Sequence, residues 1–122
     1  MSRVPKTVKS DAFDPDGIRS NSPEIEPTTM FGALSHQWRQ LALEYLAGKP
    51  AAVPLGDVAE YITVCDGDPT RDRYERVLTG LYHLHLPYLR RHQLVAYDES
   101  RTTVELLVTR GELDRYLALC SP

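Results

Sequence analysis

The order of the apolar patterns along the chain is the feature that most restricts its fold. In three successive segments apolar side chains recur every three or four residues, which predicts three amphipathic helices ending near residues 47, 64 and 94. Two short segments rich in β-forming residues follow, Val95–Tyr97 and Thr103–Val108, and the polar residues between them suit a tight turn. Thr109 and Glu112 then have the spacing of a capping box, which predicts a last helix.

This succession is the order of elements in a winged helix-turn-helix domain, whose third helix enters the major groove of DNA and whose hairpin is the wing. We therefore expect a mainly helical fold with a small β-hairpin and an extra C-terminal helix. The 122 residues allow a single core and three parts: a Pro-rich disordered tail over 1–27, the winged-helix domain over 28–108 and the C-terminal helix over 109–122. The tail is a candidate arm for a protein partner.

Local signals predict how the helices begin. The residues before the first helix, with Met30, Phe31 and Leu34, predict only a short turn packed on that helix. Ser35 is the predicted N-cap of the first helix, and Thr70 or Asp72 that of the third.

A proline interrupts the third helical pattern. Pro87 has no N–H, so the carbonyl of His83 loses its helical partner, and the helix is expected to kink or restart nearby. His85 is expected to be a half-buried ring that donates a hydrogen bond to a carbonyl freed by the proline.

One side of the third helix is the predicted DNA-contacting surface. At about 100° per residue the apolar positions share one side, and the other carries Arg73, Arg76, Gly80 and His83. Arginine can pair with a guanine edge or a phosphate, and Gly80 would let the helix approach a DNA backbone closely. With the hairpin tip added, the candidate DNA-contacting residues are Arg71, Arg73, Arg76, Thr79, His83 and Arg101. The alternative is a solvated face whose arginines pair with Asp68, Asp72 or Glu75.

The same helix contains a recognisable block. Residues 82–87 read Tyr-His-Leu-His-Leu-Pro, and this Tyr-His-x-His-Leu-Pro pattern resembles the hallmark of a haloarchaeal winged-helix family of largely unknown function. The resemblance runs from about Phe31 to Val108, and it implies a winged-helix fold with a DNA-binding role in transcription regulation. The chain departs from the family at residues 36–39, which read His-Gln-Trp-Arg in place of an Arg-rich start.

A homodimer is predicted from the last helix. Its apolar stripe, Leu113, Tyr116 and Leu117, has no obvious partner inside so small a domain. Packing of this stripe with Trp38 of the first helix across a two-fold axis would space two recognition helices for successive major grooves.

The charge of the chain leaves a rival function open. The formal net charge of -3 gives no bulk attraction for DNA, so binding would need a local basic patch. The rival is a protein-interaction module built on the winged-helix fold without DNA binding. The two functions separate on Arg73, Arg76 and Arg101, which a DNA binder needs clear of carboxylates.

Other classes of function lack their sequence signals. The chain has no Cys-x-x-Cys or His-x-x-x-His pair, so we expect neither a metal site nor a cofactor. It has no nucleophile-base pair and no Gly-rich phosphate loop, so we do not expect an enzyme. We expect a cytoplasmic protein without a membrane partner, because no apolar run approaches the roughly 20 residues of a membrane helix.

Overall fold

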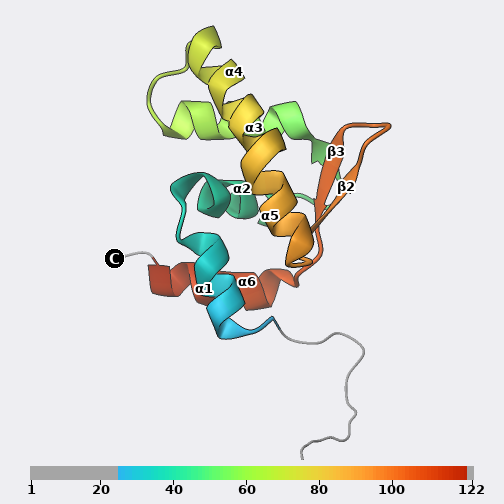
Figure 1. The fold of residues 1–122 in the computed structure, drawn as a ribbon. Coiled ribbons are helices and arrows are strands. Elements are labelled where there is room, and N and C mark those ends of the chain that lie inside the picture. The colour runs from blue at the N-terminus through green and yellow to red at the C-terminus, as the bar shows by residue number, and fades with distance from the viewer. Residues whose placement is uncertain (1–24, 121–122) are drawn as a thin grey trace, which may run out of the picture.

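The computed structural model describes residues 25–120 (Figure 1). The elements are helices α1 (Pro27–Leu34) and α2 (Gln37–Ala47), strand β1 (Val53–Pro54), helices α3 (Leu55–Cys65) and α4 (Arg71–Gly80), the π-helical turn η1 (Leu81–His85), helix α5 (Leu86–Arg91), strands β2 (Val95–Asp98) and β3 (Thr103–Leu106), and helix α6 (Arg110–Cys120). The tail predicted for 1–27 lies outside the described residues up to position 24. Order begins before its predicted boundary, because Ile25 packs on the core and α1 starts at Pro27.

The predicted fold class is confirmed. Helices α2, α3 and α4 are followed by the β2–β3 hairpin, and α6 is the extra C-terminal helix. The sheet has a third strand that was expected only as a short extended stretch: β3 pairs antiparallel with both β2 and β1, and Val104 lies opposite both Tyr97 and Val53. The wing is therefore held to the start of α3 through β1.

One core joins all the helices. Its largest fully buried side chains come from every layer of the fold, and they are Met30, Leu43, Val58, Ile62, Val77, Leu94 and Leu113. Burying a Leu or Ile side chain stabilises a fold by about 1.5–3 kcal/mol, so these positions carry much of the free energy of folding. Among the described helices, none is long and apolar enough to cross a bilayer.

Helix α1 corrects the expectation for the C-terminal stripe. The predicted short turn is a full helix, and α1 packs against α6 in Figure 1. Leu113 is completely buried, Leu117 packs on the core, and the ring of Tyr116 meets Phe31 edge to face at 5.1 Å. The expectation that this stripe lacks a partner within the chain is therefore wrong, and Leu113 has no surface left for a second copy.

The helices α4 and α5 form one continuous segment joined by η1, with a wider turn where the proline rule predicts a disturbance. The Leu86 N–H donates to the carbonyl of Leu81, five residues back, rather than to the residue four back. Helical structure thus passes through Pro87 without stopping. In Figure 1 this long segment crosses the molecule from α4, at the end remote from α1 and α6, to α5 beside the wing.

Candidate nucleic-acid interface

Helix α4 begins as its capping residue predicts. The Thr70 hydroxyl accepts a hydrogen bond from the Arg73 N–H at 3.2 Å, and the helix starts at Arg71. A similar cap starts α6, where the Thr109 hydroxyl accepts from the Glu112 N–H at 3.2 Å. The side chain of Glu112 does not complete the capping box and accepts instead from the Ile25 N–H at 2.9 Å.

Two arginines of α4 lie in solvent beside acidic residues of the same helix. Arg71 is 3.2 Å from Glu75 and Arg76 is 3.1 Å from Asp72, each pair four residues apart. The arginine side chains are 86% and 66% exposed. Exposed pairs of this kind contribute only about 0.3–0.5 kcal/mol and weaken in salt, so a phosphate can replace the carboxylate at little cost.

Arg73 is held differently from its predicted place on the outer face. Its guanidinium lies 3.2 Å from Asp66 and 3.8 Å from Asp68, both in the loop between α3 and α4, and the side chain is one-third exposed. The helical position alone assigned it to the outer face, whereas the loop carboxylates draw it back along the helix start. Arg73 therefore braces the turn between the two helices.

Gly80 does not open the outer face, as was predicted. A Cβ at this position would lie 2.8 Å from Cζ3 of Trp38, so the missing side chain makes room for an indole ring of α2. Trp38, predicted to face a second copy, is engaged within the chain on Gly80 and near the ring of His85. Thr79 and His83 are exposed, as expected.

The wing tip is an ordered turn built on Asp98. Its Oδ1 accepts from the Ser100 N–H at 3.0 Å, from the Ser100 hydroxyl at 2.8 Å and from the Arg101 N–H at 3.3 Å. These hydrogen bonds, first the one from the Ser100 hydroxyl, hold the pKa of Asp98 below its usual value. The side chain of Arg101 is 80% exposed and lies 3.9 Å from the Asp98 carboxylate, so the tip presents one loosely paired cation.

A groove separates the long helix from the wing. We call it the helix–wing groove; it has a volume of about 530 Å³ and is lined by Leu55, Gly56, Leu78, Thr79, Tyr82, His83, Tyr97, Glu99 and Thr102. The exposed side of the helix and the wing tip therefore border the same hollow, which brings Thr79 and His83 opposite Glu99 and Thr102.

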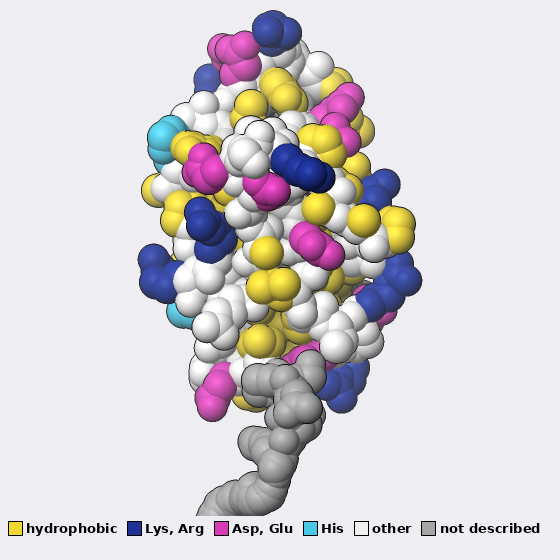
Figure 2. Space-filling view, turned by 90° about the vertical axis from the view of Figure 1, so that its right-hand side faces the viewer, with side chains coloured by type: hydrophobic (Ala, Val, Ile, Leu, Met, Phe, Trp, Pro, Cys, Tyr) yellow, Lys and Arg dark blue, Asp and Glu magenta, His cyan; other side chains and the backbone are white. Residues whose placement is uncertain are grey.

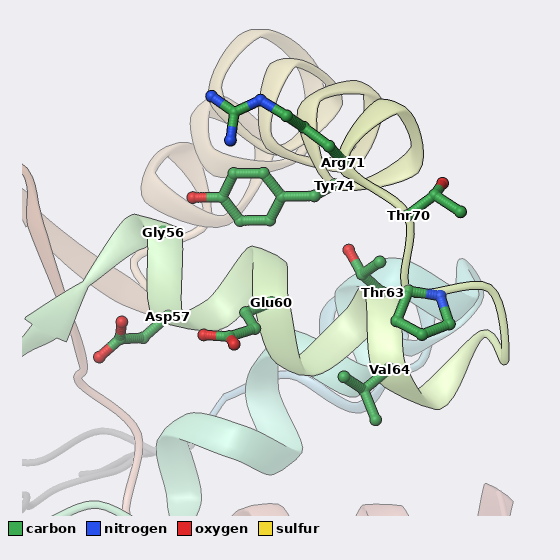
Figure 3. A pocket seen from close by; sticks show the side chains of 9 residues that line it. Gly56, Asp57, Glu60, Thr63, Val64, Thr70, Arg71 and Tyr74 are labelled. Atoms are coloured by element: carbon green, nitrogen blue, oxygen red, sulfur yellow. The ribbon is translucent and has the colours of Figure 1, made fainter.

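Acidic side chains from α3 lie next to α4. Asp57 and Glu60 line a second pocket of about 390 Å³ together with Arg71 and Tyr74, and Figure 3 shows the Tyr74 ring over α3 at Gly56. A Cβ at Gly56 would lie 2.8 Å from the Tyr74 hydroxyl oxygen, so glycine permits this close approach. Figure 2 shows basic and acidic side chains interspersed on the wing side of the described molecule, with no continuous basic patch.

The residue that sequence reasoning missed is Arg39 of α2. Its Nε donates to the carbonyl of Ala33 and its Nη2 to that of Gly32, both at 3.0 Å. Its Nη1 lies 3.3 Å from Nδ1 of His85, and the guanidinium stacks 4.0 Å from the ring centroid of Tyr88. The signal was available: no acidic residue lies three or four positions from Arg39, in contrast to Arg71 and Arg76. The side chain joins α1, α2, η1 and α5.

His85 accepts where it was expected to donate. Arg39 can only donate, so Nδ1 of His85 is the acceptor and its proton sits on Nε2. The ring is 5% exposed and its centroid lies 4.2 Å from that of His36. Burial, then the charges of His36 and Arg39, lower the pKa of His85 to about 4. His36 itself caps α2 in place of the predicted Ser35, since its Nδ1 accepts from the Trp38 N–H at 3.1 Å.

The histidines do not form a metal site. In the part of the chain that the structure describes, no group of three or more His, Cys, Asp or Glu side chains could hold a metal ion.

The fold and the helix–wing surface define a winged helix-turn-helix protein. More particularly, the chain belongs to the family described as a domain of unknown function, DUF7344, whose model matches residues 31–105. The match runs from α1 to β3 and leaves α6 outside. No curated protein and no solved structure matches the chain.

Proposed function

We propose that the protein binds double-stranded DNA and regulates transcription, with α4 in the major groove and the wing on the sugar-phosphate backbone. One observation carries the proposal: Thr79 and His83 of the helix and the wing tip border one groove, so both elements can meet the same duplex. The resemblance to the haloarchaeal winged-helix family supports the same role.

The cations proposed for this contact are Arg71 and Arg76 on α4 and Arg101 on the wing. Their carboxylate partners are exposed or loosely placed, and a DNA phosphate or guanine edge can displace them. Arg73 contributes indirectly, because its bonds to the loop set the angle between α3 and α4.

A homodimer remains part of the proposal, since one α4 reads only half of a two-fold site. Its interface has to use apolar side chains that the chain leaves exposed, such as Leu119 at 71% and Phe31 at 43%, rather than Leu113. A single monomer mass at all concentrations in light scattering would overturn the dimer.

The test of DNA binding is fluorescence anisotropy with random duplex and with the upstream region of the protein's own gene, in moderate and in molar potassium chloride. Replacing Arg71 and Arg76 by alanine should weaken binding at least about tenfold. The matched control is the replacement of Arg90 and Arg91 by alanine, which removes the same charge from exposed positions on α5. Equal loss in both variants would place the contact elsewhere, and no binding in either salt would refute the proposal.

The second candidate function, a protein-interaction module, is favoured by a specific observation. All four arginines proposed for DNA contact have a carboxylate within 4 Å, and Asp57 and Glu60 add negative charge beside α4. A surface of this kind suits a basic protein partner better than a polyanion.

Neutralising the two α3 acids separates the candidates. The double variant Asp57→Asn and Glu60→Gln should strengthen binding to DNA if phosphates approach this face, because two repulsive charges are removed. An interaction module would show no DNA binding before or after the change. Glu105→Gln, on an exposed side of β3, is the control for general loss of negative charge.

A further inference from the structure

The helix–wing groove has the size and lining of a small-molecule site. Its volume of about 530 Å³ falls within the roughly 300–1,000 Å³ of known ligand pockets. Leu55 and Leu78 supply apolar walls, and the rings of Tyr82 and Tyr97 stand nearly perpendicular with centroids 6.3 Å apart. Such a lining favours a ligand with an apolar body.

The charge of the groove selects the sign of the ligand. Glu99 is the one carboxylate among the described residues that line it, and no Lys or Arg belongs to that lining. Glu99 accepts a hydrogen bond from the Tyr82 hydroxyl at 3.2 Å. Within residues 25–120 it has no ion-pair partner, whereas the adjacent Asp98 is paired with Arg101.

The rings and the carboxylate act in the same direction. Burial and then the charge of Glu99 raise the pKa of Tyr97, which reports negative potential inside the groove. The faces of aromatic rings also attract cations. An anion would meet only repulsion here, and a neutral ligand would cover Glu99 without compensating its charge.

We propose that the helix–wing groove binds a small organic cation, with its apolar body between Leu55 and Leu78 and its ammonium group between the tyrosine rings and Glu99. A metal ion does not fit, since one carboxylate is too few ligands. The inference stands apart from DNA binding, because it rests on the lining of the groove and on no residue of the proposed α4 contact except its border.

The test uses a matched pair of probes on the isotopically labelled full chain: 2-phenylethylammonium, which is charged at neutral pH, and the neutral 2-phenylethanol. NMR titration at constant ionic strength should give saturable shifts confined to the groove with the amine, and binding at least about tenfold weaker with the alcohol. Absence of saturable shifts, or equal affinity for both probes, would overturn the proposal.

Two variants assign the effect to the charge. Glu99→Gln should lower the affinity for the amine at least about tenfold and leave the alcohol unchanged, while Glu105→Gln, outside the lining, should change neither. Tyr82→Phe removes the hydrogen bond to Glu99 but keeps the ring, so it should retain most of the affinity if the hydrogen bond only positions the carboxylate. Wild-type affinity in Glu99→Gln would refute the assignment. None of these outcomes depends on whether DNA binds.

Discussion

The two ends of the long α4–η1–α5 segment meet arginines in opposite ways. At the α4 end, Arg71 and Arg76 pair with carboxylates of their own helix and remain mostly in solvent. At the other end, Arg39 is taken up by two backbone carbonyls, the ring of His85 and the face of Tyr88. The same side chain is thus a replaceable surface charge in one region and a structural joint in the other.

The difference shows which cations are available for function. A guanidinium bound to helix-end carbonyls neutralises the negative end of α1 and leaves those carbonyls unpaired if it is removed. A guanidinium on an exposed acidic neighbour contributes little to the fold and can change partners. Function therefore has room to use the α4 arginines, and the fold depends on Arg39.

The largest expected effect is that of Arg39→Ala. It removes charged hydrogen bonds to the Gly32 and Ala33 carbonyls and the stacking on Tyr88, so the free energy of unfolding should fall by about 3 kcal/mol in urea denaturation. Arg115→Ala, an exposed arginine of α6, is the control and should change it by less than about 0.5 kcal/mol. Similar small losses in both variants would erase the contrast between the two regions.

The second effect is the pH dependence that His85 imposes on stability. Its pKa in the folded protein, about 4, lies below the model value of 6.5, so the unfolded chain binds more protons in between. Its contribution is complete above pH 6.5 and is lost as the pH falls toward 4. Wild type should lose about 2 kcal/mol more than His85→Gln between about pH 7 and pH 5, as measured by urea denaturation at both pH values. Parallel losses in the two proteins would contradict a buried neutral ring.

A smaller effect comes from the glycine against Trp38. Alanine normally stabilises a helix by about 1 kcal/mol relative to glycine, but at Gly80 its Cβ meets the indole ring, and a net loss of about 1 kcal/mol is expected. Gly111→Ala in α6, where nothing lies within 4 Å, should instead gain stability. The fluorescence of Trp38, the single tryptophan, should shift only in the first variant.

The smallest effect sharpens the comparison from the other side. Arg71→Ala and Arg76→Ala should each lower the free energy of unfolding by no more than about 0.5 kcal/mol, because their pairs are exposed. Thermal unfolding at low and high salt measures this. A loss as large as that of Arg39→Ala would show that the α4 pairs are structural.

Periodicity and capping were sufficient to predict the helices, the hairpin and the starts of α4 and α6, since these depend on neighbours in sequence. The misassigned positions depend on residues far along the chain. Gly80 faces Trp38, and Leu113 is covered because α1 forms a whole helix. Arg73 turned toward Asp66 and Asp68, whose positions follow from the angle between two helices. A helical wheel places a residue on a face, but only tertiary packing decides whether that face meets solvent.

The wide turn η1 makes the number of residues in the long helix matter. An α-helix rotates by about 100° per residue, and the extra residue of a π-turn lets the buried Leu86 and Leu89 stay in phase with the buried Val77 and Leu81. Deleting one residue between positions 81 and 85 would leave a smooth helix but swing Leu86 and Leu89 out of the core by about 100°, and re-aim the wing that follows. In this segment a deletion acts as a rotation, so its length can vary less freely than its composition.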